Sequence, residues 1–597
     1  MYSGGQPRKS RPHPTVFVYC ANNVVKGGGF VRGSSFKRLV AFAGAVAIIA
    51  AACGDSKGSS SSTTAANSPT TTGGGATTTV KLTPVKGGIL VFGQYSKESG
   101  LDPAGLAGGG TVGGNENAAI YDTLMSLDHS TGKYVGRTAE SMTPNTDFTL
   151  WTMKIRANIK FTDGTAYDAA AVKFVLDREM KDGNAAIKGQ LANFIDTITV
   201  VDALTLTFKL KIGWAGFPYL FTHVPGMIYS PTQFNKVGDP KVFAVNPGDA
   251  GAGPFKVKSY KPGESLELER NPNYWGGDVY LDGMKFVLLA SEPSRYDALK
   301  TGTLNAALFR DPAIYAQSKK DGMSTVDIPQ IAGNLMIMNS GIDITCTAPT
   351  AASIPACAGQ PDGTKVQTKT ATRDPNVRKA IAEAIDPKIV VDKAYQGAGI
   401  PNSSPFTNFQ WDPKVPGIKV DVADAKKLVT AAKAAGWDGK LRLIGGNDAT
   451  STAWVQAIKP QLEAVGMEVL ASNDTDINGV VAKVLTQKDF DTATWGLGLS
   501  DESDANYTQL LGSFGSASKR YGYSSPDMDA AIEALRVADT DAKKIAAYKT
   551  ISDIWLRDNP ALVITYIPSA VITSPKVHGI ERTGQSMTLF DKTWMEK

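Results

Sequence analysis

The chain has 597 residues, which is too many for a single hydrophobic core and predicts several domain-sized units. Hydrophobic residues make up 42% and charged residues 20%, a globular composition that argues against a disordered or collagen-like chain. Of the 62 basic residues, seven fall within residues 1–52, which contain no acid, and the remaining 55 stand against 57 acidic residues. The positive net charge therefore comes from residues 1–52. The charge of the remaining chain does not indicate a nucleic-acid partner.

Residues 36–53 have the pattern of a secretory signal peptide. Lys37 and Arg38 precede an uncharged run, Leu39 to Ala52, that leads directly to Cys53. As a helix this run would be about 21 Å long, shorter than the ~30 Å hydrocarbon core of a bilayer. Its end resembles a bacterial lipobox, in which the cysteine sulfur receives a diacylglycerol and the chain is cut just before it. An ordinary signal peptide with a chance cysteine is the alternative.

We therefore expect residues 1–52 to be a signal peptide with an N-terminal extension, and Cys53 to carry the lipid. Residues 53–85 are rich in Ser, Thr and Gly and predict a disordered linker. Together these features predict a protein anchored by lipid on the outer face of the cell membrane. Cys346 and Cys357 remain, and in an exported protein such a pair predicts a disulfide.

The predicted elements alternate between strands and helices. Residues 87–92 predict a buried strand, and 148–162 alternate in the manner of a half-buried strand pair. Asp168 is expected to cap a helix over 169–180, and 198–210 predict a strand, a turn and a strand. The following helix, after Pro375, is expected to break at Asp386-Pro387.

The second half of the chain continues this alternation. It predicts a helix over 421–436, a strand over 441–446, a helix over 452–466 and a strand over 467–472. Two amphipathic helices, 527–538 and 542–558, precede a last apolar strand over 561–567. Strands and helices in alternation indicate an α/β protein.

Several short motifs follow one another in a single order. They are GLDPAG from residue 100, AIYDTLMSLD from 119, IRANIKFTDGTAYDAAAVKFVLDR from 155, GAGPFKV from 251, LERNPNYWGG from 268 and DPNVRKAIAEAID from 374. Their order and spacing resemble the family 5 extracellular solute-binding proteins, the peptide-binding group that serves ABC importers. The resemblance covers about residues 86–590, with Ala171 where the family usually has an acid.

The resemblance implies a two-lobed fold of the periplasmic-binding-protein type II, in its large form with an extra subdomain, and a hinge between the lobes. Lobe I would comprise 86–330 with 565–597, including the extra subdomain 121–250, and lobe II would comprise 331–564. A ligand would lie between the lobes, where closure excludes water. Closure would also distinguish the loaded from the empty protein.

Residues 495–507 resemble the segment that lines the cleft in this family. Aligned without gaps, Ser500 stands where peptide binders have the aspartate that accepts the ligand's α-amino group, and Asp501 is one residue away. A solvated acidic loop is the alternative. Candidate ligand contacts from this segment and, with less support, from the loop 108–119 and the end of the strand 441–446 are Trp495, Gly496, Ser500, Asp501, Asp504, Tyr507, Asn115, Asn117 and Asn447.

No enzyme chemistry is expected. The four histidines are far apart in sequence, and no Walker loop is present, so energy for transport would come from a partner. The family resemblance implies permease subunits with a cytoplasmic ATPase, no cofactor, and a monomer that binds a small solute. An oligopeptide is the default ligand, with sugars and metal chelates open. A non-transporting envelope sensor or regulator on the same fold is the alternative function.

Overall fold

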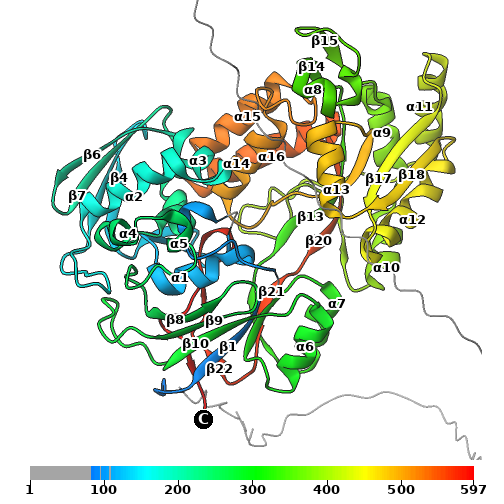
Figure 1. The fold of residues 1–597 in the computed structure, drawn as a ribbon. Helices are drawn as coiled ribbons and strands as arrows, with labels where there is room; N and C mark the ends of the chain where they lie inside the picture. Colours follow the sequence, from blue (N-terminus) through cyan, green and yellow to red (C-terminus); the bar gives the residue numbers. More distant parts are fainter. Residues whose placement is uncertain (1–81, 95, 107–108) are drawn as a thin grey trace, which may run out of the picture. The chain divides into compact units, whose positions relative to one another are not determined.

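The computed structural model describes residues 82–94, 96–106 and 109–597 (Figure 1). The predicted signal peptide, Cys53 and most of the predicted linker lie outside these residues. Lys81–Lys597 form one unit by their internal contacts. Among the described helices, none combines the length and the apolar composition that a membrane crossing requires.

A seven-stranded mixed sheet combines segments from the two ends of the described chain. The predicted first strand is confirmed as β1, which pairs in parallel with β10 on one side and β11 on the other. Tyr296 and Leu299 of helix α6 pack against β11 and β21. In order, the strands are β12 (Ser324–Asp327), β21 (Ala570–Thr573), β11 (Ala306–Phe309), β1 (Ile89–Gln94), β10 (Gly283–Leu288), β9 (Ser265–Arg270) and β8 (Phe255–Lys261).

A six-stranded sheet takes its strands from the chain between residues 330 and 567. One face of the sheet packs against α9, α10, α11 and α12 (Figure 1), and Leu335, Ile337 and Val563 on its other face belong to the main core. The strand–helix–strand succession predicted over 441–472 is confirmed, because β17 and β18 pair in parallel with α12 between them in sequence. The order is β16 (Ile400–Pro401), β20 (Ala561–Ile567), β13 (Gln330–Met338), β19 (Thr492–Gly496), β17 (Lys440–Gly446) and β18 (Glu468–Thr475).

A four-stranded antiparallel sheet lies within residues 139–210. The prediction of a strand pair over 148–162 is wrong, because only β5 forms there and its partners are β4 and β7. The chain leaves the sheet after Ile155 and turns at Asn158, whose φ is +67°, so the alternating pattern continues into a loop. The order is β4 (Ala139–Pro144), β5 (Leu150–Ile155), β7 (Thr205–Leu210) and β6 (Ile195–Asp202).

Four two-stranded antiparallel sheets complete the described strands. They are β2 (Met125–Asp128) with β3 (Lys133–Gly136), β14 (Asp343–Thr345) with β15 (Lys365–Gln367), β22 (Val577–His578) with β25 (Trp594–Met595), and β23 (Glu581–Arg582) with β24 (Thr588–Leu589).

The predicted helices are confirmed, and capping explains where they begin. Asp168 accepts a hydrogen bond of 2.9 Å from the backbone N–H of Ala171 at the start of α2. Asp386 caps α10 in the same way, and Pro387 ends the preceding helix. The helices are α1 (Asn115–Tyr121), α2 (Ala169–Asp182), α3 (Ala185–Ala192), α4 (Pro231–Val237), α5 (Pro240–Phe243), α6 (Glu292–Lys300), α7 (Pro312–Lys320), α8 (Ala348–Ser353), α9 (Pro375–Ala384), α10 (Pro387–Tyr395), α11 (Val422–Ala434), α12 (Ala449–Glu463), α13 (Ile477–Val481), α14 (Ser503–Phe514), α15 (Pro526–Arg536) and α16 (Asp541–Asp558).

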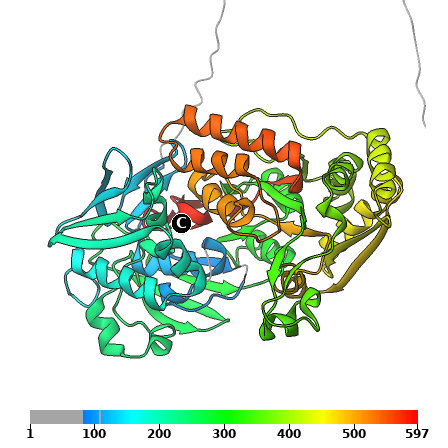
Figure 2. The ribbon, with the colours of Figure 1, turned by 90° about the horizontal axis from the view of Figure 1, so that it is seen from above.

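Two adjacent crossings connect the seven-stranded and six-stranded sheets. One runs from β12 to β13 through Ile328, and the other from β20 to β21 through Ser569. The N–H of Ile328 donates to the carbonyl of Ser569 at 2.7 Å, and the Ser569 hydroxyl donates back to the carbonyl of Ile328 at 2.5 Å. Helices α15 and α16, which precede the second crossing, pack side by side (orange in Figure 2).

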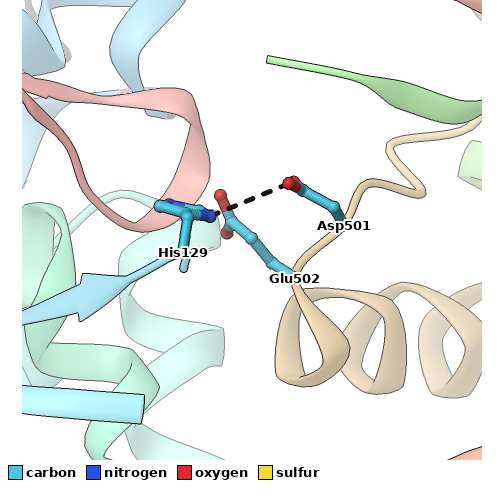
Figure 3. Close-up of side chains that lie close together, drawn as sticks. All are labelled: His129, Asp501 and Glu502. Carbon is cyan, nitrogen blue, oxygen red and sulfur yellow. Dashed lines mark ion pairs between the residues drawn. The ribbon is translucent and has the colours of Figure 1, made fainter. Parts of the chain in front are cut away.

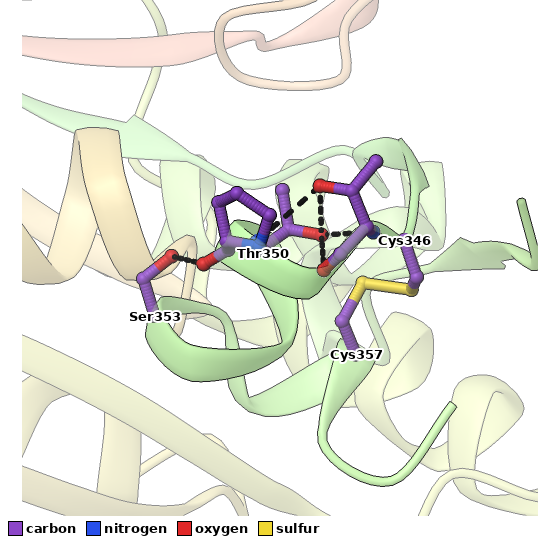
Figure 4. Close-up of a disulfide and its surroundings, with 6 residues drawn as sticks. Cys346, Thr350, Ser353 and Cys357 are labelled. Carbon is purple, nitrogen blue, oxygen red and sulfur yellow. Dashed lines mark hydrogen bonds between the residues drawn. A yellow bond between two sulfur atoms is a disulfide. The ribbon is translucent and has the colours of Figure 1, made fainter. Parts of the chain in front are cut away.

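Cys346 and Cys357 form a disulfide in the hairpin segment that contains β14, α8 and β15 (Figure 4). Their Cα atoms are 5.4 Å apart. Short-range hydrogen bonds also order this segment, because the side chains of Thr347 and Thr350 cap α8 reciprocally.

Candidate functional site

A cavity of about 580 Å³ lies between the two large sheets. One wall comes from β13, the end of β19 and helix α14, and the other comes from segments joined to the seven-stranded sheet and from α3. Polar uncharged side chains dominate the lining, and four glycines expose backbone groups. The lining residues are Gly109, Gln190, Tyr219, Arg310, Gln330, Gly333, Gly496, Leu497, Gly498, Leu499, Ser500, Glu502, Ala505, Thr508, Gln509, Gln585 and Ser586.

The loop 497–502 forms much of one wall and is fixed at both sides. Ile331 donates its N–H to the carbonyl of Leu499 at 3.0 Å, and Ser500 bridges to Gln330 beside the first crossing. The carboxamide of Asn506 accepts from the N–H of Ser500 at 2.9 Å and donates to its carbonyl at 2.8 Å. The loop is therefore held in place before any ligand arrives.

Arg310 and Glu502 are the charged residues among the described lining residues. The Arg310 guanidinium donates to the side-chain oxygen of Gln330 at 3.1 Å, and both border the cavity. Glu502 is buried, and its carboxylate accepts from the backbone N–H groups of Gln585 at 2.8 Å and Ser586 at 3.4 Å. Burial raises the pKa of Glu502 to about 7, against the opposing attraction of Arg582.

His129 meets Asp501 and Glu502, two consecutive residues of the 497–502 loop (Figure 3), and the possible ligand atoms of the three lie within 4.8 Å of one another. This arrangement has the residue types of a metal site. However, the guanidinium of Arg582 donates to both Nδ1 of His129 and Oδ2 of Asp501. The cluster thus already contains a cation, and the arrangement does not favour a metal ion.

Asp504 joins α14 to residues 121–250. Its carboxylate is buried and accepts from the indole Nε1 of Trp214 at 3.1 Å and from the hydroxyl of Tyr134. The ring of Tyr507, one helical turn farther on, lies 5.5 Å from that of Trp214. These contacts pack the wall that carries the 497–502 loop against the opposite side of the cavity.

The structure brings only some of the predicted ligand residues to the cavity. Gly496 and Ser500 line it, and Trp495 lines a smaller adjoining cavity of about 110 Å³ that shares Gly496. Asp501 is not among the lining residues, because it pairs with Arg582. Asp504 and Tyr507 are buried in the contact with Trp214.

The asparagines are placed differently from the prediction. Asn115 and Asn117 were expected in a loop facing the ligand, but they are buried in α1 and line neither of these two cavities. Asn115 accepts from the N–H of Thr588, and Asn117 donates to the carbonyls of Gly100 and Gly113. Asn447 is exposed next to Gly446 of the smaller cavity.

Sequence reasoning missed Arg310, Glu502, Gln330 and Gln585. Glu502 stood within the selected segment and was adjacent to a selected acid, so its type and position were a usable signal. The other three come from the ends of strands and from the C-terminal segment, where local sequence gives no sign that the chain reaches the cavity.

Two sheets connected by two crossings, with a cavity between them, define a two-lobed binding protein. Solved structures support this fold. Over 86% of this chain, the substrate-binding protein CtaP of Listeria monocytogenes has a TM-score of 0.67 at 20% identity, covering all of that chain. DppA of Helicobacter pylori in complex with peptide STSA has a TM-score of 0.65 at 22% identity, over 86% of this chain and 99% of its own. The predicted fold class is confirmed.

The family follows from the sequence match. The model of the bacterial extracellular solute-binding proteins, family 5 (middle region), matches residues 133–519, and the chain belongs to this family. Its members bind solutes and are not enzymes. A curated relative, the glutathione-binding protein GsiB of Pectobacterium atrosepticum, is 25% identical over 457 residues, 73% of this chain and 81% of the relative.

Proposed function

We propose that this protein is the substrate-binding lipoprotein of an ABC importer and that it captures a small oligopeptide between its lobes. The observation that carries the proposal is the cavity of about 580 Å³, whose size is in the range of small-molecule sites. Its glycines, among them Gly333, Gly496 and Gly498, let a peptide backbone approach the protein backbone closely. Gln190, Gln330 and Gln509 supply carboxamides that both donate and accept hydrogen bonds.

Names of similar proteins point in the same direction. GsiB is named as a glutathione-binding protein, and DppA was solved with a peptide. A cavity whose lining includes carboxamides, hydroxyls and glycine backbone groups suits ligands of this kind, because peptide groups form hydrogen bonds with all three. Gly496, Ser500 and Trp495 are the predicted contacts that this proposal retains, and Arg310, Gln330 and Glu502 are added to them.

The proposed lobes follow the sheets. Lobe I comprises 86–330 with the chain after the second crossing and includes the extra subdomain 121–250, and lobe II comprises the chain between the crossings. We place the end of lobe II after Ile567 and not at the boundary of 564/565 expected from the sequence, because β20 of the six-stranded sheet extends to Ile567. We further propose that Cys53 carries a lipid, that 53–85 tether a monomeric body to the outer face of the cell membrane, and that permease subunits with a cytoplasmic ATPase accept the ligand.

Native mass spectrometry of the purified protein, followed by calorimetry with di- to pentapeptides, sugars and metal chelates, tests the proposal. A peptide should co-purify or bind, and deletion of the gene should reduce its uptake. Gly496→Leu should abolish binding, because the nearest atom to a Cβ at Gly496 is 4.0 Å away and the side chain would enter the cavity. Gly105→Leu, at an exposed glycine with open space around it, is the control.

Peptide binding without any loss of uptake on deletion would favour the sensor alternative. Absence of binding to every peptide, with unchanged uptake, would refute the importer function.

A further inference from the structure

Arg582 is a buried cation that the protein itself places at the acidic end of the cleft. Its side chain is only 6% exposed. One terminal nitrogen donates to the backbone carbonyl of Asp327 at 2.7 Å, beside the first crossing, and the other donates to His129 and Asp501. Three acceptors from three segments therefore fix the guanidinium, as a buried charge requires.

His129 takes part as a neutral acceptor. Burial, with the adjacent Arg582 charge, lowers the pKa of His129 to about 4, so the imidazole is uncharged at neutral pH. Its Nδ1 then accepts from Arg582, while its Nε2–H donates to the carbonyl of Thr583 at 3.3 Å. The imidazole thus orients Arg582 toward Asp501 without competing with it as a second cation.

Both acidic side chains of the 497–502 loop already have partners within the protein. Asp501 pairs with Arg582, and Glu502 accepts two backbone N–H groups of the 585–586 turn. Ser500 and Glu502 line the cavity, and Asp501, which lies between them in sequence, does not. On the cavity side, Arg310 supplies a positive charge.

We propose that Arg582 sets ligand specificity by serving as the counter-ion of Asp501 in place of a ligand ammonium. The cavity then selects a peptide whose carboxylate binds Arg310 and which needs no free amino group. This inference rests on the proposed function and specifies its ligand class. A ligand ammonium would compete with a guanidinium that is already desolvated and fixed by three acceptors. A ligand carboxylate would meet a guanidinium that borders the cavity, a charge-assisted contact.

Calorimetry with three forms of trialanine tests the inference: the free peptide, the N-acetylated peptide and the C-terminal amide. The wild-type protein should bind the acetylated form at least as tightly as the free peptide, and amidation should weaken binding tenfold or more. Arg582→Gln should shift the preference about tenfold toward the free amine, because Asp501 loses its counter-ion. Arg582→Lys, which keeps a cation, should bind like the wild type.

A double variant, Arg582→Gln with Asp501→Asn, separates the electrostatic effect from a change in folding. It lacks both charges and should lose the preference for the free amine. The inference is overturned, with the proposed function intact, if the wild-type protein prefers the free amine tenfold and Arg582→Gln leaves that ratio unchanged. It is likewise overturned if Mn²⁺ or Zn²⁺ binds the wild type at the His129 cluster. If no form of trialanine binds any of the variants, no peptide of the wider panel binds the wild type and uptake is unchanged on deletion, the proposed function fails as well.

Discussion

A methyl group on Gly216 would lie 1.7 Å from Oδ1 of Asp504, so the two residues fit together only because Gly216 has no side chain. Gly216 belongs to the proposed extra subdomain, and Asp504 lies in the first turn of α14 on the other side of the cavity. The carboxylate cannot turn aside without losing the hydrogen bonds from Trp214 and Tyr134. This contact is therefore a sensitive probe of lobe closure.

Gly216→Ala should weaken ligand binding about tenfold or more, because an overpacked contact costs about 1–3 kcal/mol. The backbone at Gly216 has φ −92°, which alanine adopts without strain, so the effect is steric. Small-angle scattering with ligand should show a less compact protein than the wild type. Gly512→Ala is the control. Gly512 lies on α14, the helix of Asp504, and has no atom near the new methyl group, so this variant should behave like the wild type. Equal affinities for all three proteins would show that closure does not require this contact.

Glu502 should make the folded protein less stable as pH rises from about 4.5 to 7. Burial above all raises its pKa from an ordinary 4.5 to about 7, so the folded state retains a proton that the unfolded state has lost. The full difference corresponds to about 3 kcal/mol above pH 7. Relative to the wild type, Glu502→Gln should therefore gain stability between pH 5 and pH 8 in urea unfolding experiments.

The comparison between the two proteins isolates Glu502 from other groups. His129, whose pKa is lowered to about 4, destabilises the fold as pH falls below 6.5, but it is present in both proteins. A difference in unfolding free energy that stays constant from pH 5 to pH 8 would contradict a raised pKa for Glu502.

Cys53→Ala should release the protein from the membrane without changing its solute affinity. The proposed lipid is attached at Cys53, whereas the cavity residues lie in the body from residue 109 onward. Membrane fractionation with radiolabelled palmitate measures the first effect, and calorimetry on the purified variant measures the second. Ser56→Ala, in the same predicted linker and with Cys53 kept, is the control. Continued membrane association of the Cys53 variant would exclude this lipid site.

Replacing Cys346 and Cys357 with serine should lower the unfolding free energy by at most about 3 kcal/mol, since the disulfide closes a short loop. Neither residue is among those lining the 580 Å³ cavity, so ligand affinity should stay the same. Urea unfolding and calorimetry provide the two measurements. A large loss of affinity would connect this hairpin to the binding site, contrary to the expectation.

The sequence predicted what local signals specify. Asp168 caps a helix as predicted, and the helix after Pro375 is interrupted at Asp386-Pro387 as predicted. The alternating pattern over 148–162 failed after Ile155, because alternation continues through a loop without a partner strand. The local sequence pattern therefore predicted most helices and strands, but it did not predict the residue at which a strand leaves its sheet.

The site depended on contacts between distant segments, which no local pattern reveals. Asn115 is the right residue type for binding a ligand, yet its partner is the backbone of Thr588, far along the chain. Asp501 was selected because it stands one residue from the position of the family's aspartate, and only the folded chain shows that it pairs with Arg582. Family resemblance selected the segment from Trp495 to Tyr507, of which Gly496, the last residue of β19, and Ser500 line the cavity.

Hydrogen bonds between Ile328 and Ser569 make the two crossings one antiparallel ribbon that continues from the β13–β20 pair to the β12–β21 pair. Such a ribbon bends readily out of its own plane, whereas bending within the plane would stretch one strand and compress the other. The lobes should therefore open and close by a hinge rotation about a single axis. A permease that responds to this angle alone would distinguish a filled cavity from an empty one, whichever ligand fills it.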